Sequence, residues 1–166
     1  MILRAIDLVS RTSGLIAAWL IVPLILATCY EVVSRYVFGA PTIWAYEIGY
    51  IMTGSGFLLG MAYTLNQGAH IRIDVLYLSL SRKAQALVDL VGYVFLLVPF
   101  ITWLSFALYW RAIDAMQTLE RSGQSAWNPV VWPFRTVFFV SFVLLLIQVI
   151  GELIKAGRVL AGREKA

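Results

Sequence analysis

The chain has 166 residues, of which 61% are hydrophobic, with a mean hydropathy of +0.83 and a formal net charge of +4. Soluble domains have an apolar share nearer ~45–50%, so this composition excludes an ordinary soluble domain and indicates an integral membrane protein. The single cysteine, Cys29, excludes an internal disulfide.

Four long apolar runs alternate with short polar connections. Each run is long enough to cross the ~30 Å hydrocarbon core of a bilayer at ~1.5 Å rise per residue. We therefore expect an all-α integral membrane protein whose four transmembrane helices form one domain over residues 1–166. The expected spans are approximately residues 12–35, 43–65, 85–110 and 134–155.

The first run follows basic residues, as the apolar part of a signal peptide does. It continues through Pro23 to Tyr30 without a small-residue cleavage site, so we expect a retained span. Pro23 lacks a backbone donor, which predicts a kink in this helix. Gly39 and Pro41 predict a tight turn after it, and Thr42 is placed to cap the second helix.

The distribution of Lys and Arg predicts the orientation of the spans. Nine of the 13 basic residues fall on the side that holds both termini and the connection between the second and third spans. Because excess Lys and Arg mark the cytoplasmic face, we expect both termini to be cytoplasmic. The same distribution explains the positive charge, so no nucleic acid is expected as a partner. The four basic residues expected outside are Arg35, Arg111, Arg121 and Arg135.

Small and hydroxylated residues form a stripe on the second span. Gly49, Thr53, Gly56 and Gly60 recur at spacings of 4, 3 and 4, which places them on one helical face. Such a stripe lets another backbone approach closely, so we predict that helices pack there. Glu47 projects about half a turn away, so this helix is expected to have two faces with different neighbours.

The connection between the second and third spans is expected to contain a short segment lying in the membrane interface, at residues 69–80. It holds His70, the only histidine, with Asp74 one helical turn away. A b-type haem needs two axial ligands, and no Cys-x-x-Cys-His motif occurs. We therefore expect no cofactor and no metal ion. Since catalytic motifs are also absent from the sequence, we expect no enzyme activity.

Charged residues continue beyond the third span. We expect a helical extension through Arg111, Asp114 and Glu120 that ends at Ser122 and Gly123. The fourth span should follow the proline-containing segment at residues 127–133.

Glu31, Arg35 and Glu47 are expected at similar depths, near the ends of the first two spans. Glu31 and Arg35 are four residues apart, so one helical face presents both. Two interpretations stay open: a relay for ions or protons, and a structural ion pair of Glu31 with Arg35, in which Glu47 joins either that pair or an adjacent subunit. We favour the structural pair because water near span ends lowers the cost of a charge.

Three motifs occur in order along the first half: residues 31–41 (EVVSRYVFGAP), Trp44 with Glu47, and residues 68–74 (GAHIRID). Together they resemble the small permease subunit (DctQ type) of tripartite ATP-independent periplasmic (TRAP) transporters, and the second half is similar mainly in hydropathy. Eight residues of these motifs are candidate partner-interface or structural ion-pair positions: Glu31, Arg35, Tyr36, Trp44, Glu47, His70, Arg72 and Asp74.

The resemblance implies a small subunit of the bacterial inner membrane that scaffolds a large permease of the DctM type. It further implies that a periplasmic solute-binding protein of the DctP type delivers an organic acid, and that an ion gradient drives its uptake by symport. The ion and substrate sites would belong to the large subunit. Membrane lipids are the remaining expected partners.

Two other classes of protein fit the sequence less well. An autonomous four-helix exporter acting as a homodimer would need Glu31 deep in the bilayer, whereas Glu31 falls near a span end beside Arg35. The basic bias also disfavours insertion in two orientations. A quinone- or haem-type redox subunit is disfavoured by the single histidine.

Overall fold

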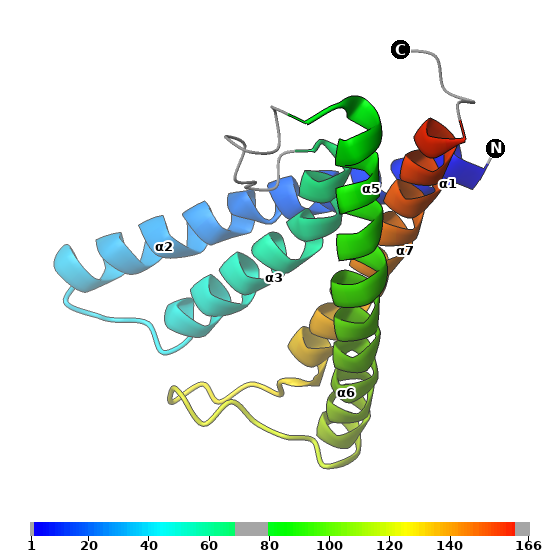
Figure 1. Cartoon of the computed structure of the whole chain (residues 1–166). Helices are drawn as coiled ribbons and strands as arrows, with labels where there is room; N and C mark the ends of the chain where they lie inside the picture. Colours follow the sequence, from blue (N-terminus) through cyan, green and yellow to red (C-terminus); the bar gives the residue numbers. More distant parts are fainter. Residues whose placement is uncertain (1, 69–79, 162–166) are drawn as a thin grey trace.

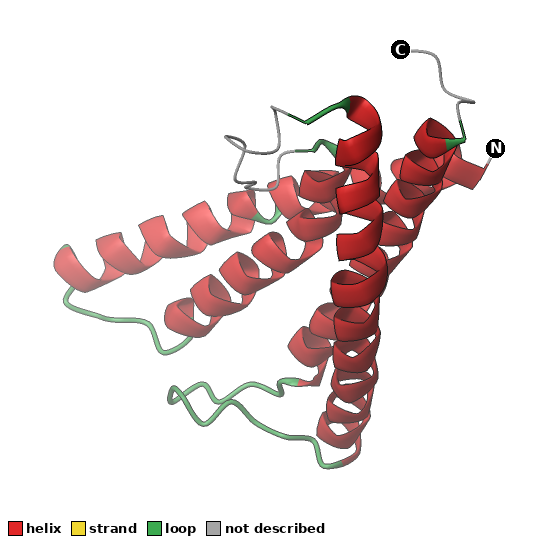
Figure 2. Ribbon diagram, in the orientation of Figure 1, coloured by secondary structure: helices red, strands yellow, loops and turns green. Residues whose placement is uncertain are grey.

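The computed structural model of the chain describes residues 2–68 and 80–161. Their secondary structure is helical, with irregular connections between the helices (Figure 2). The elements are α1 (Ile2–Trp19), α2 (Ile21–Tyr36), α3 (Ala45–Asn66), α5 (Arg82–Gly92), the π-helical turn η1 (Tyr93–Leu97), α6 (Val98–Gln117) and α7 (Trp132–Leu160).

Four helical runs are long and apolar enough to cross a membrane, which confirms the predicted number of spans. They are Ile2–Tyr36, Ala45–Asn66, Lys83–Gln117 and Trp132–Leu160. The first and third runs have 35 residues each, longer than the spans expected from hydropathy alone, because polar helical turns continue them at their ends. The side on which the termini lie stays a prediction.

Both 35-residue runs are irregular just before a proline. The first is interrupted at Leu20, three residues before Pro23. The third widens into η1, which ends two residues before Pro99. A proline ring crowds the carbonyl four residues earlier and provides no N–H to bond it, so the helix must open there. The helix is thus interrupted close to Pro23, while a kink there stays a prediction.

The helices form two layers that meet at one end (Figure 1). The α1–α2 rod packs along α3, and the rod of α5, η1 and α6 packs along α7. Contacts of α1 and α3 with α7 join the two layers. Figure 1 shows the layers together near the described chain ends and diverging towards the α2–α3 and α6–α7 connections. We call the latter the loop end of the molecule.

Two glycines lie in close contact with side chains of neighbouring helices. A Cβ added at Gly14 of α1 would lie 2.5 Å from Cγ of Tyr63, and one at Gly54 would lie 2.7 Å from Cζ of Phe134. In the predicted stripe, a Cβ at Gly56 would lie 3.6 Å from the carbonyl oxygen of Ala17, whereas one at Gly60 would meet nothing within 4 Å. The tightest contacts therefore lie beside the stripe, and a packing role for its full length stays a prediction.

The expected helical extension after the third span is wrong in its end point. The helix α6 ends at Gln117, and Leu119 adopts a left-handed φ of 48° that takes the chain out of the helix. Beyond it, residues 118–131 fold back on themselves through an isolated bridge between Arg121 and Val130. Glu120 therefore belongs to this connection, which we call the 118–131 loop.

Candidate functional site

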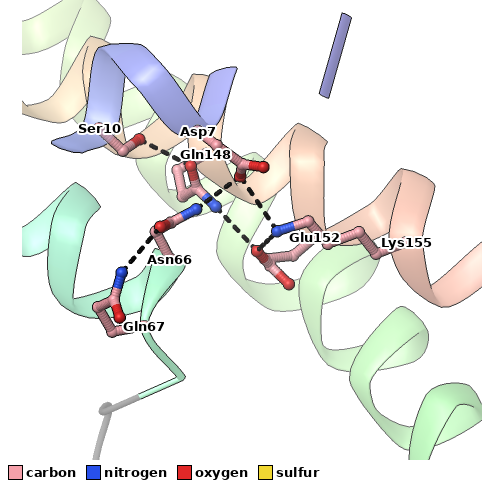
Figure 3. A network of polar contacts seen from close by, with 7 residues as sticks. All are labelled: Asp7, Ser10, Asn66, Gln67, Gln148, Glu152 and Lys155. Atoms are coloured by element: carbon pink, nitrogen blue, oxygen red, sulfur yellow. Dashed lines mark hydrogen bonds and ion pairs between the residues drawn. The ribbon is translucent and has the colours of Figure 1, made fainter. Parts of the chain in front are cut away.

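Polar side chains gather at three places between the helices. Two lie at the loop end: the hairpin cluster (Glu31, Arg35 and Thr42) and the loop cluster (Glu47, Ser122 and Ser125). The third, which we call the clasp, consists of Asp7, Ser10, Asn66, Gln148, Glu152 and Lys155 (Figure 3).

The hairpin cluster contains the ion pair expected from the spacing of Glu31 and Arg35. Nε of Arg35 donates to Oε1 of Glu31 at 2.8 Å, and Nη2 also contacts that oxygen. The other carboxylate oxygen accepts from the backbone N–H of Thr42 at 2.8 Å and from its hydroxyl. The Thr42 hydroxyl oxygen in turn accepts from the N–H of Ala45 at the start of α3 at 3.3 Å. Glu31 thus ties the end of α2 to the turn before α3.

Two aromatic residues of the motifs have different surroundings. Trp44 stacks on Tyr30 of α2 with ring centroids 5.6 Å apart, so its ring contributes to packing within the chain. Tyr36, at the end of α2, is 79% exposed and stays available to a partner.

Glu47 does not join Glu31 and Arg35, and in this respect the sequence-based expectation is wrong. Its side chain is buried, with 2% exposure, and accepts from the hydroxyl of Ser125 at 2.8 Å and from that of Ser122. Glu31 and Glu47 project from different helices towards different neighbours, because Glu47 faces the 118–131 loop. The carboxylate therefore tethers that loop to the first turn of α3.

The clasp connects α1, α3 and α7 where the two layers meet (Figure 3). Asp7 of α1 accepts from Asn66 Nδ2 at 2.6 Å and from Lys155 Nζ at 3.2 Å. Lys155 also donates to Glu152 at 2.8 Å. Three helices distant in sequence thus share one charged network.

The most deeply buried part of the clasp is uncharged. Ser10 is 1% exposed and Gln148 is fully buried; the serine hydroxyl donates to Oε1 of the glutamine at 2.7 Å. Nε2 of Gln148 donates to Glu152 at 2.8 Å, so both ends of the amide have partners. No pattern in the sequence had indicated this site. Its available signal was a glutamine inside an otherwise apolar run.

A pocket of about 300 Å³ lies beside the loop cluster, and we call it the loop pocket. Arginines from α6, the 118–131 loop and α7 line it, namely Arg111, Arg121 and Arg135. Arg135 donates to Glu120 at 2.5 Å, and Arg121 donates to the carbonyl of Asn128 at 2.9 Å. Three of the four basic residues expected on the side of the membrane opposite to the chain termini therefore line the same pocket.

The remaining candidates include His70, Arg72 and Asp74, which lie outside the described residues together with the expected interfacial segment at 69–80. Within residues 2–68 and 80–161, no group of three His, Cys, Asp or Glu side chains is placed to hold a metal ion. The clusters described above instead join helix to helix and helix to loop.

The sequence matches a family described as tripartite ATP-independent periplasmic transporters, DctQ component, over residues 24–158. No curated individual protein matches the chain. The family match spans α3 and α6 entirely and most of α2 and α7, so it includes the hairpin cluster, the loop cluster and part of the clasp. Since it covers well over half of the 166 residues and four helices are suited to membrane crossing, the chain belongs to the DctQ family and is a small multi-pass membrane component of TRAP transporters.

Proposed function

We propose that the chain is the static, supporting subunit of a TRAP transporter in the bacterial inner membrane. It holds a large DctM-type permease while that permease imports an organic acid, delivered by a DctP-type periplasmic protein, by symport along an ion gradient. The chain forms one four-helix domain with both termini cytoplasmic. The main observation in support is that the hairpin cluster, the loop cluster and the clasp join separate parts of the chain to one another.

The arrangement of these contacts supports a positioning role. The clasp fixes α1 and α3 to α7 at one end, and the loop cluster fixes the start of α3 to the 118–131 loop at the other. Buried polar groups with satisfied partners rigidify a structure and specify one arrangement of it. A subunit built in this way presents a surface of constant shape to a moving neighbour.

The exposed end of α2 is the part that we propose contacts the large permease. Arg35 keeps 54% of its side chain exposed although it pairs with Glu31, and Tyr36 beside it is 79% exposed. Tyr and Arg are the residue types enriched among energetically dominant interface contacts. Apolar side chains of α2, including Ile25 and Leu26, are more than half exposed and continue this surface into the membrane.

Co-purification tests the interface. An affinity tag on the chain should retain the large permease in mild detergent, and Arg35→Ala should lower the retained amount by about tenfold, the effect of losing 1.4 kcal/mol. Arg35→Lys keeps the charge without the planar fork and should recover part of the loss. Arg11→Ala is the matched control, because Arg11 is an exposed arginine of α1 remote from this surface. Equal retention by all variants would remove Arg35 from the interface.

Reconstitution tests the role itself. Vesicles that contain the large permease, this chain and the binding protein should take up substrate when an ion gradient is imposed, and vesicles that contain only this chain should not. Vesicles with the permease but without this chain should lose most uptake. Gradient-driven transport by the chain alone would overturn the supporting role and restore the autonomous exporter.

A further inference from the structure

We propose that the loop pocket is a binding site for the phosphate of a membrane phospholipid. Its lining combines basic side chains with apolar ones. Arg111, Arg121 and Arg135 face two carboxylates, Glu47 and Glu120, among the ionisable residues of its lining, which leaves one net positive charge. The apolar lining residues include Ile51, Leu108, Phe134 and Phe138.

The carboxylates of the pocket already have donors within the chain, whereas the arginines have unused ones. Ser122 and Ser125 bind Glu47, and Arg135 binds Glu120. Arg111 has neither a hydrogen-bond nor an ion-pair partner among the described residues, and it is exposed. Nε of Arg135 is buried and lacks a hydrogen-bond partner within the same part of the chain. An oxyanion would satisfy donors that this chain leaves unused.

On α6 and α7 the arginines lie nearer the helix ends than two of the apolar lining residues, Leu108 and Phe138. The arginines lie where helices end: Arg111 in the last two turns of α6 and Arg135 in the first turn of α7. Phe138 lies nearly one turn further along α7 than Arg135, towards the middle of the span. A phosphate held by the arginines would therefore place the first acyl carbons near Leu108 and Phe138.

Aromatic residues support this depth. Tyr109 and Trp110 precede Arg111 on α6, and Trp132 begins α7. Tyrosine and tryptophan concentrate at the level of lipid headgroups, where the ring contacts the acyl chains and the polar atom contacts water. The arginines of the pocket are therefore expected at the height of the phosphates of one leaflet. Arginine suits such a ligand because its planar donors match phosphate oxygens in pairs.

Native mass spectrometry of the purified full chain, delipidated in mild detergent, tests the site. Phosphatidylglycerol added back should bind, and diacylglycerol with the same acyl chains but no phosphate should bind at least about tenfold more weakly, as expected when a charge-assisted hydrogen bond is absent. Equal binding of the two lipids would overturn the proposal. Millimolar inorganic phosphate should displace little lipid, because it lacks acyl chains. Full displacement, with phosphate bound as tightly as lipid, would identify a soluble anion as the ligand and overturn the lipid assignment.

Two double variants locate the bound lipid. Arg111→Gln with Arg121→Gln should weaken phosphatidylglycerol binding by about tenfold or more. Arg4→Gln with Arg11→Gln removes two exposed arginines of α1 and should leave it unchanged. Thermal unfolding in detergent checks that both double variants fold. If either does not fold, the comparison of phosphatidylglycerol with diacylglycerol on the unmodified chain still tests the proposal. Equal loss in both pairs would mean that lipid binds to surface charge in general, and no loss in either would place it elsewhere; both results contradict the proposal.

Discussion

Lys155 on α7 donates a hydrogen bond to Asp7 on α1 across 3.2 Å, although 148 positions separate the two residues in the sequence. Because Asp7 also accepts from Asn66 of α3, this single carboxylate connects three of the membrane helices. The clasp therefore depends on a residue in the first two turns of the described chain.

The charged part of the clasp should show modest coupling. Asp7→Asn and Lys155→Gln are each expected to lower the thermal unfolding midpoint in detergent. Their double-mutant cycle should give a coupling energy of about 0.5–1 kcal/mol, because both side chains are about one-third exposed. Arg158→Gln, an exposed charge on the same helix, serves as the control. Strict additivity of the two single variants would show that the pair contributes nothing.

The buried part of the clasp should cost more to break. Gln148→Met leaves the hydroxyl of Ser10 without its acceptor in a buried position, at an expected cost of about 1–3 kcal/mol in the free energy of unfolding. Adding Ser10→Ala should recover part of that loss, because no orphaned donor remains. Gln117→Met, at an exposed position of α6, should change the unfolding midpoint little. A fully stable Gln148→Met variant would argue against the network.

The tether of the 118–131 loop should be visible by limited proteolysis. Glu47→Ala removes the acceptor of Ser122 and Ser125, so the loop should be cleaved faster than in the unmodified protein. Glu47→Gln keeps an acceptor oxygen and should lie between the two. Asp114→Ala, at an exposed position of α6, is the control. Unchanged cleavage in Glu47→Ala would show that other contacts hold the loop.

Two glycine substitutions should have opposite effects on stability. An alanine Cβ at Gly14 would lie 2.5 Å from Cγ and 2.7 Å from Cβ of Tyr63, close to the base of that side chain, so Gly14→Ala should destabilise by about 1–3 kcal/mol. Gly60→Ala meets nothing within 4 Å and should be neutral or stabilising by up to about 1 kcal/mol through helix propensity. The thermal unfolding midpoints of both variants, measured in the same detergent, test this difference. A loss at Gly60 of the size seen at Gly14 would contradict the contacts.

Local patterns in the sequence predicted local structure well. Hydropathy located the four spans, and the spacing of Glu31 and Arg35 predicted their ion pair, because both signals act within a few residues. Thr42 accepts from the N–H of Ala45 at the start of α3, as a capping residue would, although the N-cap position itself is Trp44. Such features depend on helical geometry alone and need no knowledge of which helices are neighbours.

Contacts between distant helices were not predictable in the same way. Glu47 finds its donors 75 and 78 positions further along, and Ser10 finds its acceptor 138 positions away. No periodicity reports such pairings. The glycine stripe indicated one face of α3, yet the glycine of α3 with the tightest contact to α7 is Gly54, off the stripe, where the ring of Phe134 occupies the space.

The length of the first helical run has a consequence for the surrounding bilayer. A straight helix of 35 residues measures about 52 Å, whereas the hydrocarbon core is about 30 Å thick. The run must therefore lean steeply, or extend along the membrane surface at one end. Either geometry makes the protein cover more membrane area than an upright bundle of the same mass. Lipids under the leaning helix are sheltered on one side, so local bilayer thickness beside this subunit should differ from that of the open membrane.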